Sequence, residues 1–198
     1  MSEIADFIAG QKVIAILRNM SVADSVRLAR KAWDLGIDLV EVPIQTDDAR
    51  ASLEAVLDAA RDAGRPIAAG TVTTVEQVEY CARVGVAFTV APGFDPEVVA
   101  ASQRLGLPHI PGVSTPTEIQ AAVKAGCHVL KAFPATVLGT EWFKTMRGPF
   151  PRVQFMVTGG IDSRNAADYL AAGAVMVGVG SALDDPSQLD ALAALARN

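Results

Sequence analysis

The sequence has little of what disulfide frameworks or imidazole metal sites require. It contains two cysteines, Cys81 and Cys127, and two histidines, His109 and His128, in 198 residues. The cysteines show no CxxC spacing and suggest no disulfide framework, which fits a reducing cytoplasm. The histidines stand far apart in the sequence, at predicted strand starts. We therefore expect no metal site built on imidazole ligands.

Long apolar runs and blocks of positive charge are also missing. The uncharged stretch from Ala171 to Leu183 is interrupted by three glycines, and it is shorter than the roughly 20 residues of a membrane-spanning helix. Glu3 and Asp6 precede any apolar run, unlike a signal peptide. The net charge of −5, without a basic block, argues against nucleic acid or an anionic membrane as the main partner. We expect a cytoplasmic protein that acts on a small molecule.

What the sequence does have is glycine at regular intervals. Each of six glycines follows a helix-like stretch and precedes a short apolar run, and glycine is the usual residue just beyond a helix end. Most intervals are close to 21 residues, and the last interval is about two such units. This spacing indicates a repeated unit of strand and helix. The glycines are Gly36, Gly64, Gly85, Gly106, Gly126 and Gly173.

Eight strands are predicted from the apolar runs, with helices in the gaps. Eight strands, with helical segments in the gaps between them, favour a single compact (β/α)8 TIM barrel over residues 1–198. A doubly wound open sheet is the alternative, but no GxGxxG follows the first strand. The predicted strands are Val13–Leu17, Leu39–Pro43, Ile67–Gly70, Ala87–Ala91, His109–Gly112, Val129–Phe133, Gln154–Val157 and Ala174–Val179. Helical spacing covers Asp24–Leu35, Asp48–Ala63, Val75–Val84, Pro96–Leu105, Pro116–Ala125, Ala166–Ala172 and Pro186–Arg197.

Lys131 lies in the middle of an apolar strand, in the run Val-Leu-Lys-Ala-Phe-Pro. A strand buried on both faces is normally hydrophobic throughout, and a lysine is almost never fully buried. Burial favours the neutral, nucleophilic amine, which makes Lys131 a candidate Schiff-base former. On this segment alone, a strand end that turns the amine to solvent, or a salt bridge, has similar weight.

Glu41 is placed in the same way in the strand Leu39–Pro43. Because side chains alternate along a strand, Glu41 shares a face with Leu39, and Lys131 shares a face with Val129. If these are the inward faces, both groups project into one cavity. A structural ion pair is the alternative, but buried pairs contribute little stability, so we favour chemistry.

Two strand ends are rich in glycine: Thr158-Gly159-Gly160 and Gly180-Ser181. At the carboxyl ends of the last two barrel strands, such backbone can donate N–H groups to an anion next to a helix N-terminus. We expect a phosphate site there. The alternative is that these glycines only form turns.

Together these segments resemble the class I aldolases that cleave 2-keto-3-deoxy-6-phosphogluconate (KDPG), with their relatives acting on the phosphogalactonate epimer and on 4-hydroxy-2-oxoglutarate (KHG). The resemblance implies a compact (β/α)8 barrel, usually a homotrimer, with no metal or organic cofactor. Its motifs run in family order from about residue 13 to 183. They are Ala15–Arg18, Glu41–Pro43, Ala69–Val72, Ala91–Gly93, Ile110–Gly112, Lys131–Ala135, Gly148–Pro151, Thr158–Ile161 and Gly180–Ser181.

The resemblance also implies residue roles. Lys131 matches the Schiff-base lysine and Glu41 the glutamate that moves protons, while Thr71 matches a residue that holds the pyruvate carboxylate. Pro92 and Phe133 match cavity-lining positions. Gly159, Gly160 and Ser181 match positions that contact the phosphate, and Thr158 and Gly180 stand beside them in the sequence.

The sequence departs from the family pattern at two positions that bear on the substrate. Gln45 stands where phosphogluconate-type members have a carboxylate-binding arginine; it can donate hydrogen bonds but carries no charge. Arg18 could supply that charge from the first strand. Val179 replaces a glycine that often precedes the second phosphate loop.

These observations predict an enzyme: a carbon–carbon lyase that cleaves a 2-keto-3-deoxy-6-phospho sugar acid to pyruvate and glyceraldehyde 3-phosphate. A KHG aldolase giving pyruvate and glyoxylate, or an aldolase specific for the phosphogalactonate epimer, is the alternative within the family. Other readings are a barrel isomerase or phosphosugar synthase that needs no imine, and a non-catalytic barrel that binds a phosphosugar.

Overall fold

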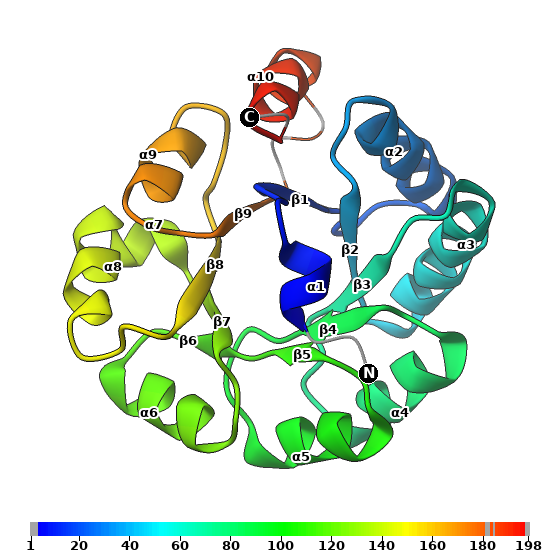
Figure 1. Cartoon of the computed structure of the whole chain (residues 1–198). Helices are drawn as coiled ribbons and strands as arrows, with labels where there is room; N and C mark the ends of the chain where they lie inside the picture. The colour runs from blue at the N-terminus through cyan, green and yellow to red at the C-terminus, as the bar shows by residue number, and fades with distance from the viewer. Residues whose placement is uncertain (1–3, 181–182, 184, 197–198) are drawn as a thin grey trace.

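The fold is a parallel β-barrel surrounded by helices (Figure 1). The computed structural model describes residues 4–180, 183 and 185–196. Within these residues nine strands form one sheet in the order β5-β4-β3-β2-β1-β9-β8-β7-β6, and every paired neighbour is parallel. The strands are β1 (Val13–Ile16), β2 (Leu39–Pro43), β3 (Ile67–Gly70), β4 (Phe88–Val90), β5 (His109–Ile110), β6 (Gly112–Val113), β7 (Val129–Ala132), β8 (Gln154–Thr158) and β9 (Met176–Val179).

The barrel is completed where β5 and β6 follow each other along the chain. Ile110 in β5 is in register with Val90 of β4, whereas Gly112 in β6 is in register with Lys131 of β7. Pro111 separates the two short strands, and its carbonyl accepts a hydrogen bond of 2.9 Å from the backbone N–H of Lys131. Proline has no N–H to donate to a strand ladder. The predicted fifth strand is therefore one barrel position divided into two halves.

All the described helices except α1 form a ring around the barrel and pack their apolar faces on its outer surface (Figure 1). Helix ends follow the local sequence: Thr74 and Thr115 each begin a helix with a complete capping box, which satisfies otherwise unpaired backbone N–H groups. The helices are α1 (Ile4–Ile8), α2 (Val22–Asp34), α3 (Asp47–Ala63), α4 (Val75–Val84), α5 (Pro96–Leu105), α6 (Pro116–Lys124), α7 (Ala135–Leu138), α8 (Thr140–Arg147), α9 (Ala166–Ala171) and α10 (Pro186–Ala196).

The core has two layers, one on each face of the sheet. The outer layer joins strands to helices and includes Val40, Leu130 and Val157. The inner layer fills the barrel and is a separate cluster. Alternate residues of each strand contribute to it, as the strand period requires. It contains Ile8, Ile14, Leu39, Ala68, Phe88, Val90, Ile110, Val129, Met156 and Met176.

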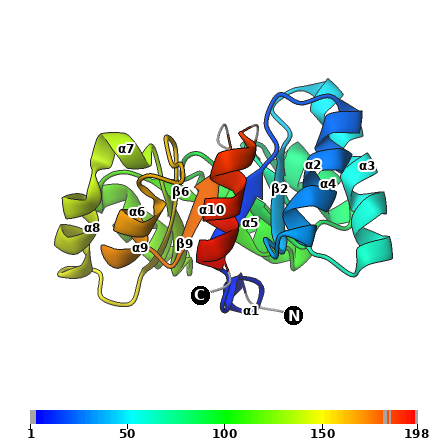
Figure 2. The ribbon, with the colours of Figure 1, turned by 90° about the horizontal axis from the view of Figure 1, so that it is seen from above.

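Helix α1 closes the N-terminal end of the barrel. It lies across the centre of the ring in Figure 1 and at one end of the barrel in Figure 2. Ile8 is buried in the inner core, with Ile4 and Phe7 packed against it. The rings of Phe7 and Phe88 have centroids 5.7 Å apart. The interior is thus covered on this side, which leaves the carboxyl ends of the strands as the open side.

The predicted barrel is confirmed, and so is the helix-ending role of the six recurrent glycines, all of which have positive φ. Three helices were not predicted: α1, α7 and α8. Among the described residues, no helix combines the length and hydropathy needed to cross a membrane.

Candidate active site

A cavity of about 350 Å³ lies at the carboxyl ends of β1, β8 and β9. Several residues that the sequence predicted for the site line it, from strands far apart in the chain. This is the end of a (β/α)8 barrel that carries active sites. The lining consists of Ile16, Arg18, Asn19, Met20, Phe133, Thr158, Gly159, Gly160, Ile161, Gly178 and Gly180.

Lys131 points to the inside of the barrel from the middle of β7. Its side chain is 2% exposed, and Val129, two residues earlier on the same face, belongs to the inner core. Its Nζ lies 5.2 Å from the ring centroid of Phe133, which lines the cavity. The amine therefore stands inside the barrel beside the cavity, which excludes the strand end that would turn it to solvent.

Glu41 points inward from the middle of β2, and its side chain is fully buried. Neither of its carboxylate oxygens has a hydrogen-bond partner among the described residues. The adjacent strand provides the room, because a β-carbon at Gly70 would overlap the Glu41 carboxylate. A buried carboxylate without a partner is costly. It is better explained as a group held ready for a reacting molecule than as a source of stability.

The two buried groups act on each other electrostatically. Burial lowers the pKa of Lys131 below its usual range, and the Glu41 carboxylate opposes that shift while Arg18 adds to it. Burial raises the pKa of Glu41, and the positive charges of Lys131 and Arg18 oppose that shift. Both shifts favour the neutral forms, a free amine and a carboxylic acid. A neutral amine can act as a nucleophile, and a carboxylic acid can act as a proton donor.

Arg18 and Gln45 lie at the mouth of the barrel, after β1 and β2. Both side chains are exposed, and Arg18 lines the cavity. Gln45 is outside the lining but donates a hydrogen bond from Nε2 to Oδ1 of Asn19, at 2.9 Å. Asn19 has a left-handed backbone, with φ of 57°. This hydrogen bond ties the two loops together and places a neutral amide beside the cationic Arg18.

The two glycine-rich strand ends meet at the cavity. Gly159, Gly160 and Gly180 line it, together with Thr158, whose buried hydroxyl has no partner among the described residues. Asn165 donates a hydrogen bond of 2.9 Å to the carbonyl of Gly160, and a β-carbon at Gly160 would meet Thr136 Oγ1 at 2.5 Å. Ser181 lies outside the described residues.

Thr71 and Pro92 occupy the carboxyl ends of β3 and β4 but are not in the cavity lining. Thr71 has a left-handed φ of 57°, an uncommon conformation for a β-branched residue. A β-carbon at Gly112 would overlap the backbone of Pro92, and Gly112 is in register with Lys131. Pro92 thus packs against β6, the strand that pairs with β7, which carries Lys131.

A family model, "KDPG and KHG aldolase", matches residues 4–196 of the chain. The chain belongs to the KDPG and KHG aldolase family. It is 39% identical over 171 residues to the 2-dehydro-3-deoxy-phosphogluconate aldolase of Treponema pallidum, covering 86% of this chain and 80% of the relative. It is 37% identical over 175 residues to a probable 2-dehydro-3-deoxy-6-phosphogalactonate aldolase of Rhizobium meliloti, covering 88% and 82%.

Solved structures match this aldolase over almost its whole length. A KDPG aldolase from Legionella pneumophila, with pyruvate captured as a covalent carbinolamine, aligns with a TM-score of 0.86 at 30% identity, covering 98% and 97% of the two chains. A cube-shaped cage designed by fusing symmetric oligomeric domains aligns with a TM-score of 0.86 at 30% identity, covering 94% of this chain and 72% of the other.

Several residues of this aldolase site were not predicted from the sequence. Asn19, Met20 and Ile161 line the cavity, and Gly70 makes room for Glu41. Asn19 is a polar residue three positions after the end of β1, and a polar residue close to a strand end is a signal that the sequence offers. The need for glycine at position 70 depends on a contact between two strands, which no local pattern reveals.

Proposed function

We propose that this aldolase is a class I enzyme that cleaves a 2-keto-3-deoxy-6-phospho sugar acid to pyruvate and glyceraldehyde 3-phosphate. The observation that carries the proposal is the pair of buried ionisable groups, Lys131 and Glu41, on the inner faces of β7 and β2. The lowered pKa of Lys131 supports a nucleophilic amine, and an unpartnered carboxyl supports proton transfer. The proposal takes the whole chain as one aldolase domain that needs no metal or organic cofactor.

The first half of the reaction forms an imine. The neutral Nζ of Lys131 adds to the C2 carbonyl, and the resulting carbinolamine loses its hydroxyl as water after protonation. Glu41, with its raised pKa, donates that proton directly or through a water molecule. The product is a protonated imine, which can accept the electron pair released in the next step.

The second half breaks the carbon–carbon bond. The ionised Glu41 takes the proton of the C4 hydroxyl, the C3–C4 electron pair moves toward C2 to form an enamine, and C4 leaves as the aldehyde. Glu41 then returns a proton to C3, and water hydrolyses the imine to release pyruvate and the free amine. Hydrolysis of the protonated imine releases a proton that restores the acid form of Glu41, so the cycle needs no external proton donor.

The remaining site residues hold the substrate. The backbone of Gly159, Gly160 and Gly180, with Ser181 and Thr158 beside it, binds the phosphate. Thr71 and the cationic Arg18 hold the carboxylate end, with Gln45 adding hydrogen bonds, and Phe133 and Pro92 form apolar walls. We further propose a cytoplasmic homotrimer, for which the match to the designed cage of symmetric oligomeric domains is support.

A second candidate within the family is cleavage of KHG to pyruvate and glyoxylate. It is favoured by Gln45, which is neutral, and by Val179, which replaces a glycine before the second phosphate loop. The phosphogalactonate epimer is also favoured by the 37% identity to the Rhizobium meliloti relative. These candidates share the imine chemistry and differ only in the configuration at C4 and in the part of the substrate beyond it.

Pyruvate release from three substrates, measured side by side, tests the assignment. The candidates are the 6-phosphogluconate-derived keto acid, its phosphogalactonate epimer and KHG. We expect one of the two phosphorylated acids to give the highest kcat/KM. A higher value for KHG would replace the main proposal by the second candidate. If none of the three substrates released pyruvate, the aldolase proposal would give way to a non-catalytic barrel that binds a phosphosugar.

A further inference from the structure

A second cavity, of about 690 Å³, lies at the opposite end of the barrel from the candidate active site. Its walls come from α1 and from the segments that lead into β5, β7 and β8. His109 is the first residue of β5, Val129 of β7 and Gln154 of β8. A molecule bound there is separated from Lys131 by the packed interior of the barrel, so this cavity is not a part of the aldolase site.

Two buried polar groups in this wall have no hydrogen-bond partner among the described residues: Nε2 of His109 and Oγ of Ser102. Ser102 is 1% exposed. Thr89 Oγ1 lies 2.8 Å from Nδ1 of His109 and so fixes the imidazole ring. Burial lowers the pKa of His109 to about 4, and the ring is therefore neutral near pH 7. Unpartnered polar atoms of this kind are rare in protein interiors, and they are well suited to a neutral group of a ligand.

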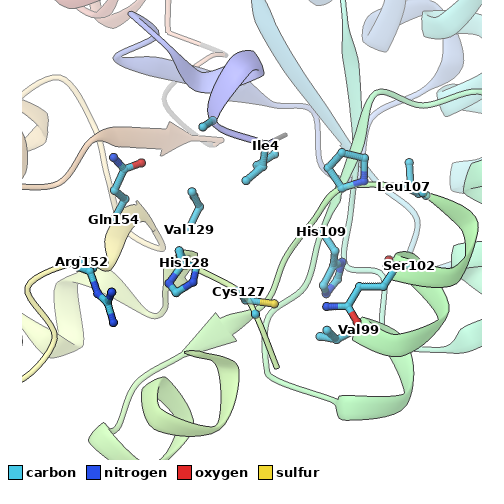
Figure 3. A pocket seen from close by; sticks show the side chains of 15 residues that line it. Ile4, Val99, Ser102, Leu107, His109, Cys127, His128, Val129, Arg152 and Gln154 are labelled. Atoms are coloured by element: carbon cyan, nitrogen blue, oxygen red, sulfur yellow. The ribbon is translucent and has the colours of Figure 1, made fainter. Parts of the chain in front are cut away.

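The other side of the cavity carries positive charge. Figure 3 shows Arg152, His128 and Gln154 on one side, and His109, Ser102 and Val99 on the other. Among the described residues, the lining contains no aspartate or glutamate, although the chain has 22 acidic residues and a net charge of −5. Ile4, Val99, Leu107 and Val129 supply apolar surface between the two polar sides. A few convergent polar groups in an apolar cavity of this size are typical of small-molecule sites.

We propose that this cavity binds a small organic monoanion with an apolar body. Its anionic group faces Arg152, and a hydroxyl at its other end hydrogen-bonds to His109 Nε2 and Ser102 Oγ, after a side-chain movement that uncovers these two buried atoms. The site is independent of the proposed aldol reaction, because none of its residues lies at the catalytic end of the barrel.

The first experiment uses two probes that fit this description and differ in length, 4-hydroxyphenylacetate and 3-(4-hydroxyphenyl)propanoate. Neither has a keto group, so neither can form an imine with Lys131. Binding is followed by the amide NMR signals of Gly106 and Gly126, which line this cavity, and of Gly159 and Gly160, which line the catalytic one. We expect saturable shifts at Gly106 and Gly126 for at least one probe, with Gly159 and Gly160 unchanged.

Variants then test the two polar sides separately. Arg152→Ala is expected to weaken binding of the anionic probe about tenfold, because it removes a charge-assisted hydrogen bond. Ser102→Ala is expected to weaken the hydroxylated probe several-fold and to leave phenylacetate, which lacks the hydroxyl, unaffected. Arg27→Ala is the matched control, since Arg27 is an exposed arginine on α2 that pairs only with Asp24 among the described residues.

The outcomes that overturn the site are distinct. Absence of saturable shifts at Gly106 and Gly126 with both probes would overturn it, and so would shifts confined to Gly159 and Gly160. Equal weakening in Arg152→Ala and Arg27→Ala would show a general charge effect in place of a site. Thermal unfolding of each variant verifies that it is folded before binding is compared.

Discussion

Gly70 on β3 lies directly against the Glu41 carboxylate of β2, so that a β-carbon at position 70 would overlap Oε1. The two strands are paired in register, with Glu41 opposite Ala68 and Pro43 opposite Gly70. The position of the carboxyl group therefore depends on the absence of a side chain on the next strand. This relationship can be tested without changing any ionisable group.

Gly70→Ala is expected to displace the Glu41 carboxyl and to lower kcat at least tenfold, because a positioned acid–base group contributes about 10² to 10⁴ in rate. Imine formation should persist, so borohydride with pyruvate should still label the protein. Gly93→Ala is the matched control at the same end of the barrel, since a β-carbon there meets nothing within 4 Å. A Gly70→Ala enzyme with the wild-type kcat would contradict the role of this contact.

Lys131→Met is expected to abolish turnover and borohydride-dependent labelling by pyruvate, because the amine that forms the imine is gone while the buried volume is retained. Mass spectrometry after borohydride treatment checks the labelling. Lys144→Met is the control, since Lys144 is exposed on α8 and pairs with Glu141. Glu41→Gln should retain labelling and lose about 10² to 10⁴ in kcat. Labelling of the Lys131→Met protein would refute the Schiff-base assignment.

The phosphate loops predict a substrate-dependent effect. Gly160 has a φ of 79°, and a β-carbon there would meet Thr136 Oγ1 at 2.5 Å. Gly160→Ala should therefore distort the loop and raise KM for the phosphorylated substrates at least tenfold, with little change for KHG. At Gly180 a β-carbon would meet its nearest neighbour, the carbonyl oxygen of Ile16, at 3.6 Å, so Gly180→Ala should be tolerated by the fold. Equal KM increases for all substrates in Gly160→Ala would contradict a phosphate role.

His109 predicts a loss of stability in acid. Burial lowers its pKa from 6.5 to about 4 in the folded chain, so between these values the unfolded chain binds a proton that the folded chain does not. The free energy of unfolding should then fall as the pH decreases from 6.5 to about 4, by at most about 3 kcal/mol from this group. Urea unfolding across this interval measures the slope.

The chain offers a matched pair of histidine variants for this measurement. His109→Gln should show a smaller slope than the wild type, because the buried imidazole is removed. His128→Gln should keep the wild-type slope, because His128 is exposed. The same slope in all three proteins would show that the acid loss comes from other groups.

The barrel could be predicted because its repeat is local. Glycine just beyond each helix and apolar runs at a regular pitch are visible without any tertiary contact. Helix α7 escaped prediction because it has only four residues, and periodicity needs a longer window. Length does not account for α8, which has eight residues, since α9 was predicted with six. What fixes α8 is tertiary: Phe143 packs edge-on to Phe155 and Tyr169. The division of the fifth predicted strand at Pro111 is also tertiary, because β5 pairs with β4 and β6 pairs with β7.

The two central residues of the candidate site, Lys131 and Glu41, stand out in the sequence because charges in apolar strands are conspicuous. Their inward direction follows from the strand period, and the structure places both on the inner face of the barrel. The hydrogen bond between Gln45 and Asn19 spans 26 positions, and the contact of Gly70 with Glu41 crosses two strands. Contacts of this kind are set by the three-dimensional register, and no local pattern encodes them.

Helix α1 closes one end of the barrel, since Ile8 and Phe7 pack against its inner core. On the proposed chemistry, the substrate must therefore enter, and both products must leave, at the carboxyl ends of the strands. The pyruvate fragment stays tethered to Lys131 at the bottom, while the aldehyde occupies the space above it. The aldehyde must therefore leave first, which imposes an ordered release of products and, in the reverse direction, requires pyruvate to enter before its partner.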